Sequence, residues 1–178
     1  QLADLPSEQA LATLAASGIL TQSAAAQAAQ LLLASAVTYP VQAQRWIPVI
    51  DAMLSATGSG PETAADFTYA RSRLAAEQGN LVAAEALLQQ ARGLWQQTGD
   101  DISLARSGLG LTQLLAMQGR FAEAEVTIRA SVDALSTIQS DEALLIEMDA
   151  RQNLATLLSY QERFLEAAEI NSDLRQRY

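Results

Sequence analysis

The sequence predicts an all-α protein built from helical hairpins, and three features support this fold class. Of the 178 residues, 49% are hydrophobic, but much of that fraction is alanine, which has the highest helix propensity, and only 5% are aromatic. The chain has 9 glycines and 4 prolines, far fewer turn residues than a β-sandwich needs. Apolar residues recur at helical spacing through nearly the whole sequence. Together these features predict about eight or nine helices joined by short turns.

Residues 1–60 are expected to form an N-terminal helical segment. Ser7 suits the N-cap of a first short helix, and a second helix should start at Thr21 or Ser23. A third helix is expected over 41–56, where Pro48 either kinks the helix or lies in the first turn of a restarted one.

Residues 61–178 show a more regular pattern, which follows the breaker-rich stretch that ends at Pro61. Asp100 and Ser140 are suited to cap the N-termini of two of the helices in this region. Because the connections are short, consecutive helices should pack antiparallel, as three hairpins. The six helices are predicted at 62–78, 80–98, 101–118, 120–138, 141–160 and 163–177.

The three hairpins align on their turns. Gly79, Gly119 and Glu162 occupy equivalent turn positions, at spacings of 40 and 43 residues. A leucine before each turn is expected to face the partner helix. A large apolar residue after the turn should close over that leucine. An alanine three residues further on should let the two helices approach closely. In that order the three sets are Leu74, Leu114 and Leu157; Leu81, Phe121 and Phe164; and Ala84, Ala124 and Ala167.

This pattern resembles the tetratricopeptide (TPR) repeat. The resemblance rests on Gly79-Asn80-Leu81…Ala84…Leu88…Ala91 and its second copy, Gly119-Arg120-Phe121…Ala124…Ile128. It covers about residues 62–178, and 22–56 is interpreted as a degenerate repeat. The resemblance implies a right-handed αα-hairpin solenoid, with another αα-solenoid as the alternative.

The sequence departs from the common TPR pattern in three respects. The usual period is ~34 residues, so the resemblance is to the long-period variety. Ser72, Thr112 and Ala155 stand at the position of the family's small residue in the first helix, and Glu162 replaces the turn glycine.

Composition excludes several functions. The formal net charge is −9, and all 11 basic residues are arginine, which argues against a nucleic-acid partner. Cysteine and histidine are absent, so thiol and histidine catalysis and zinc sites with nitrogen or sulfur ligands are excluded. Paired carboxylates lie at the start of predicted helices, where their negative charge interacts favourably with the helix dipole. No catalytic residue, cofactor or metal ligand is therefore predicted, and the chain is not expected to be an enzyme.

No apolar run approaches the ~20 residues that cross a bilayer. Because the acidic net charge also keeps a protein soluble and monomeric, we expect a soluble monomer, in the cytoplasm rather than exported. The polar final helix suggests that the array closes near Tyr178 and that further sequence lies upstream of Gln1.

The TPR resemblance implies a concave groove, lined by the first helix of each hairpin, that binds a peptide or helix. Both tryptophans, Trp46 and Trp95, are interpreted as core or inter-repeat contacts. The family's carboxylate clamp is not expected, because the chain has no lysine. The groove candidates are Asp66, Tyr69, Arg73 and Glu77 in the first repeat, Arg106, Gln113 and Met117 in the second, and Asp149, Gln152, Thr156 and Tyr160 in the third.

The sequence thus favours a protein-binding scaffold or adaptor. An alternative is the sensor or regulatory TPR region of a larger bacterial enzyme, such as a caspase-like protease, or of a transcription regulator.

Overall fold

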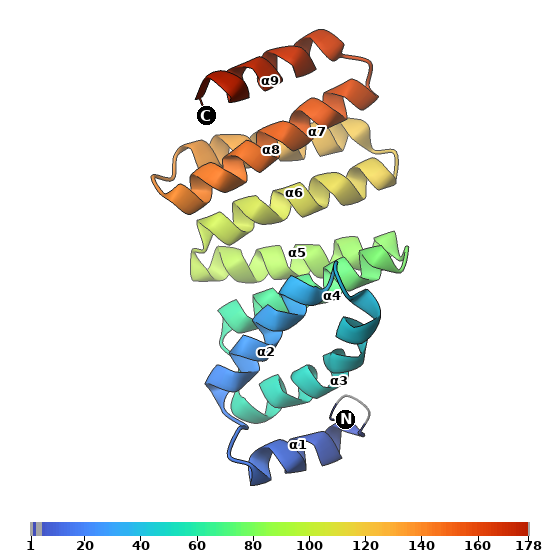
Figure 1. The fold of residues 1–178 in the computed structure, drawn as a ribbon, viewed down its shortest axis with the longest axis vertical. Helices are drawn as coiled ribbons and strands as arrows, with labels where there is room; N and C mark the ends of the chain where they lie inside the picture. Colours follow the sequence, from blue (N-terminus) through green and yellow to red (C-terminus); the bar gives the residue numbers. More distant parts are fainter. Residues whose placement is uncertain (1, 3–4, 178) are drawn as a thin grey trace. The chain divides into compact units, whose positions relative to one another are not determined.

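The structure, a computed structural model, describes residues 2 and 5–177. Over these residues it contains nine helices and no strand, which confirms the predicted all-α class (Figure 1). The helices are α1 (Ser7–Ala16), α2 (Gln22–Ser35), α3 (Pro40–Thr57), α4 (Pro61–Glu77), α5 (Leu81–Thr98), α6 (Asp101–Met117), α7 (Phe121–Ser136), α8 (Asp141–Tyr160) and α9 (Phe164–Arg177). The six helices predicted after residue 61 end within two residues of these bounds. Tyr178, near which the array was expected to close, lies outside the described residues.

Side chains cap several helices as predicted. Asp100 and Ser140 accept hydrogen bonds from backbone N–H groups three residues on, at 2.9 and 3.0 Å. Of the two starts considered for α2, Thr21 is the cap. Ser7, by contrast, is the first residue of α1 and follows a Pro6 N-cap, so its predicted capping role is wrong. Pro48 lies inside a continuous α3, so that helix does not restart there.

Each of the three predicted turns contains one residue in the left-handed conformation. The φ angles are 76° at Gly79, 75° at Gly119 and 62° at Glu162. Among the described residues, Glu162 is the only non-glycine residue with positive φ. Its turn is closed by Arg163 N–H donating to the Leu158 carbonyl at 2.9 Å. The third hairpin therefore has the same turn geometry without the glycine that usually provides it.

The helices group into two compact units, one up to Thr98 and one from Gly99. In the first, α4 pairs with α5 and also packs on α2, α2 packs on α3, and α1 packs on α3. In the second, α6 pairs with α7, α7 packs on α8, and α8 pairs with α9. The first unit extends past residue 60 because α4 packs against α2.

The N-terminal helix pair α2–α3 stacks differently from the later hairpins. In the second unit, α7, the second helix of its hairpin, makes most of the contact with the next hairpin. In the first unit, α2, the first helix of its pair, makes most of the contact with α4, whereas α3 makes little. Residues 22–56 therefore form a helical pair as expected, with a packing order of their own.

Small residues lie where the two helices of each hairpin cross. Ala84 and Ala124 are fully buried, and Ala167 is 3% exposed. Facing them, Ser72 donates a 2.7 Å hydrogen bond to the Ala84 carbonyl, and the buried Thr112 donates to the Gly108 carbonyl of its own helix at 2.7 Å. The predicted close approach at the alanines is confirmed, and the leucines before the turns are also buried (Leu74, Leu114 and Leu157).

The large apolar residues after the turns, which were predicted to close over those leucines, are only partly buried. Phe121 is 40% exposed and Phe164 is 63% exposed, while Leu81 is half-buried. Each is the first residue of its helix, and helical side chains tilt toward the N-terminus. These side chains therefore project past the end of the hairpin. Trp46, predicted to be a core or inter-repeat contact, is also exposed.

Replacing Glu162 by glycine should stabilise the protein. A side chain in the left-handed region costs about 1–2 kcal/mol, of which the greater unfolded-state entropy of glycine cancels about 0.5–1 kcal/mol. We expect Glu162→Gly to raise the free energy of unfolding by about 0.5–1 kcal/mol in urea denaturation. Gly119→Ala is the converse control: a Cβ there meets nothing within 4 Å, so any loss reflects backbone strain alone. An unchanged or lower stability for Glu162→Gly would contradict this account.

Enlarging the crossing residues should destabilise the fold. Ala84→Leu and Ala124→Leu should each lower the free energy of unfolding by about 1–3 kcal/mol, because the helices would have to separate. Gln89→Ala, at an exposed position of α5, serves as the control and should be nearly silent. Equal small effects at all three positions, measured by urea denaturation, would show that the alanines do not limit helix approach.

Candidate functional site

Helix α8 buries one side and exposes the other along its full length. Ala143, Ala150 and Leu154 are among its buried residues. The exposed residues Leu145, Asp149, Gln152, Thr156 and Tyr160 follow one another at intervals of three or four, so they form one stripe. Four of these five are predicted groove residues, and the structure brings them together on one side of one helix.

The second hairpin adds to this surface. Gln113 and Met117 of α6 are exposed, and Arg106 is half-buried. Arg106 forms an ion pair with Glu142 of α8, and the two helices also contact each other directly. The predicted groove residues of the second and third hairpins thus belong to two adjacent helices. We name these residues the α6/α8 face: Arg106, Gln113, Met117, Leu145, Met148, Asp149, Gln152, Thr156 and Tyr160.

Sequence reasoning missed the apolar part of this face. Leu145 is 63% exposed and Met148 is half-buried. The sequence did contain a sign that an apolar residue would be exposed here, because Leu144, Leu145 and Ile146 are consecutive. Three consecutive helical residues span about 200° around the axis, which is wider than one buried side. Ile146 is buried, and the two leucines are the ones left exposed.

The first-repeat candidates behave differently from one another. Tyr69 is buried and packs edge-on against the buried Trp95, with ring centroids 5.4 Å apart. Tyr69 follows the buried Ala65 by four residues and precedes the buried Ser72 by three, so all three share the core side of α4. Its assignment to the groove is therefore wrong, while the core assignment of Trp95 is confirmed.

The other three first-repeat candidates remain accessible on α4. Arg73 and Glu77 are exposed, and Asp66 is half-buried. The Arg73 guanidinium lies 5.9 Å from the centre of the Tyr69 ring, within cation–π range. The buried Tyr69 ring thus helps to hold the Arg73 side chain in place but is not itself available to a partner.

Several carboxylates of the second unit form ion pairs. Glu147 is buried and pairs with Arg151 at 2.6 Å, and Arg151 also lies 3.8 Å from Asp173. Within the described part of the chain, no three histidine, cysteine or acidic side chains are arranged to hold a metal ion. These contacts join α8 to α9.

A second ion network joins α7 to α9. Glu125 accepts hydrogen bonds from Arg163 at 2.6 Å and from Arg129 at 2.8 Å, and Arg163 also pairs with Glu166 at 2.6 Å. Burial disfavours the charged form of Glu125, but the hydrogen bonds from Arg129 and Arg163 outweigh it and lower its pKa. The network therefore stabilises the packing of the two hairpins only while Glu125 is ionised.

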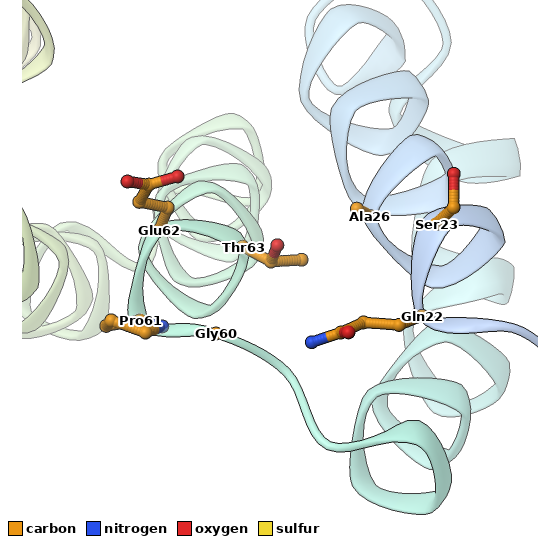
Figure 2. Close-up of a pocket in the computed structure, with 7 residues that line it drawn as sticks. All are labelled: Gln22, Ser23, Ala26, Gly60, Pro61, Glu62 and Thr63. Atoms are coloured by element: carbon orange, nitrogen blue, oxygen red, sulfur yellow. The ribbon is translucent and has the colours of Figure 1, made fainter.

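A pocket of about 530 Å³ lies in the first unit, between the start of α2 and the start of α4 (Figure 2). Gln22 reaches across from α2 and donates a 2.8 Å hydrogen bond to the Gly58 carbonyl. Glu62 is the only charged residue in its lining. Its lining residues are Gln22, Ser23, Ala26, Gly60, Pro61, Glu62 and Thr63.

No family model matches this chain, and no curated protein matches it. None of the described helices is both long enough and apolar enough to cross a membrane.

Acid should weaken the second unit through Glu125. Because its pKa is lower in the folded state than its usual 4.5, its contribution is present above that value and is lost as the pH falls through the folded-state pKa. We expect Glu125→Gln to reduce stability at neutral pH by about 0.5–1 kcal/mol and to lessen the loss of stability on acidification. Asp133→Asn, at an exposed position of the same helix, serves as the control. Parallel pH profiles for wild type and Glu125→Gln in urea denaturation would count against the network.

Proposed function

We propose that the chain is a protein-binding scaffold of the TPR type and that its α6/α8 face binds a peptide or helix of a partner protein. The observation that carries the proposal is the exposed stripe of α8. Its side chains are available along the whole helix, while the opposite side of the helix is held in the core.

The chemistry of the face suits a protein partner. Tyr160 is 76% exposed and Met117 is 54% exposed, and tyrosine and methionine are enriched in protein interfaces. Methionine can also adapt its shape to different apolar side chains. Gln113, Gln152 and Thr156 add hydrogen-bonding groups between the apolar ones. This mixture supports recognition of a peptide more than that of a nucleic acid or a small molecule.

The hairpins themselves support the TPR assignment. The three turns have equivalent left-handed residues at spacings of 40 and 43, and small residues lie at the helix crossings.

A face built on helices is preorganised, so binding loses little entropy from ordering the scaffold. We further propose that the scaffold acts as a monomer with a protein partner.

Selection from a random peptide display library tests the proposal. Peptides that bind wild type should bind Leu145→Ser and Tyr160→Ser about tenfold more weakly or worse, because each change removes apolar area buried on binding. Both residues are exposed, so the variants should fold.

Val126→Ser is the matched control, because Val126 is an apolar residue of α7 that is 71% exposed. It should leave peptide binding unchanged. Failure to enrich any peptide, or equal binding to all of these variants, would refute the proposed face.

A further inference from the structure

The α6/α8 face and the adjoining first turn of α8 carry negative charge that the two helices do not neutralise. Asp141, Glu142 and Asp149 all lie on the exposed side of α8. Glu142 pairs with Arg106, whereas Asp141 and Asp149 form no ion pair with any residue that the structure describes. The one described basic residue of α8, Arg151, is paired with Glu147 away from this stripe.

The two unpaired carboxylates flank an apolar residue. Asp141, Leu145 and Asp149 are spaced four residues apart, so they lie in a row with about 6 Å of helix rise between neighbours. The row therefore has a carboxylate at each end and an apolar side chain between them, and it is about 12 Å long. Met148 lies beside Leu145 and widens its apolar part.

We propose that the occupant of the α6/α8 face is a basic amphipathic segment of a partner protein, with an apolar side chain between two cationic ones. This inference rests on the proposed function and names its partner class. Cations about 12 Å apart fall about eight residues apart on a helix, or about four apart on an extended strand. Such a segment places its apolar side chain on Leu145 and Met148 and its cations at Asp141 and Asp149.

Charge selects this occupant over others. A neutral or acidic segment would cover the two carboxylates without pairing them, and desolvating an unpaired charge is costly. A second copy of this chain would bring a further net charge of −9 to an already acidic surface. The same net charge attracts a basic segment and speeds its association.

Synthetic peptides test the inference by fluorescence anisotropy. The probe has leucine midway between two lysines eight residues apart in a neutral helical background, and its counterpart has glutamate in place of both lysines. Wild type should bind the lysine peptide at least about tenfold more tightly, and the difference should shrink as ionic strength rises.

Asp149→Lys should weaken binding of the lysine peptide about tenfold and should remove its advantage over the glutamate peptide, because each peptide would then meet one opposite and one like charge. Asp149 is preferred to Asp141 for this test because Asp141 lies in the first turn of α8, where its charge stabilises the helix. The matched control is Asp133→Lys, the same charge change at an exposed position of α7, which should alter binding less than twofold.

Three outcomes would overturn the inference. Equal weakening by Asp133→Lys and Asp149→Lys would show general attraction to an acidic chain. Library-selected peptides that depend on Leu145 but lack basic residues would leave the proposed function standing and refute its charge selectivity. Self-association of wild type that Leu145→Ser abolishes, detected by light scattering, would make the face a contact between copies of the chain. The proposed function itself fails if no peptide is enriched, or if Leu145→Ser and Tyr160→Ser leave the binding of every selected peptide unchanged.

Discussion

The close approach of the two helices in each hairpin is the constraint on which the rest of the structure depends. Ser72 reaches the backbone of Ala84, and a Cβ added at Gly108 would lie 1.8 Å from the Ser131 hydroxyl oxygen. At such separations a larger side chain cannot be accommodated without moving a helix. The crossing therefore fixes the rotation of α6 about its own axis, and a buried Ala155 does the same for α8. Once that rotation is fixed, the residues on the far side of each helix are exposed, so the α6/α8 face follows from the packing beneath it.

The arginines of the second unit are largely used to join helices. Arg106 links α6 to α8, Arg163 links α9 to α7, and Arg151 pairs within α8 while approaching α9. These internal uses leave the chain's acidic surplus on its surface, including Asp149 on the α6/α8 face. The same distribution of charge thus stabilises the stacking of hairpins and leaves the exposed face negatively charged. Such ion pairs contribute modestly when exposed, and the partly buried ones, such as that of Glu147, depend on keeping both partners charged.

The sequence predicted the helices, the turns and the crossings, because each depends on local residue type and on a repeat that aligns equivalent positions. It predicted the orientation of individual side chains less well. Phe121 and Phe164 were assigned by their distance from a turn, yet the first residue of a helix points back past the hairpin. Tyr69 was assigned by its family position, although its spacing from Ala65 and Ser72 places it in the core. Leu145 was missed because the groove candidates were taken from family positions and not from the side of the helix that would remain exposed.

The physical basis of the proposed selectivity is the same whether the α6/α8 face belongs to a free adaptor or to the regulatory region of a larger protein. Its binding groups lie on two helices whose rotation is set by buried crossings, so the spacing between Asp141, Leu145 and Asp149 cannot adjust to a partner. A rigid spacing of this kind rejects a segment whose charges fall out of register, because a cation displaced by one helical turn would meet Leu145 and leave a carboxylate unpaired. Selectivity then comes from the cost of mismatched charge, and the apolar contact at Leu145 supplies affinity that many partners could share.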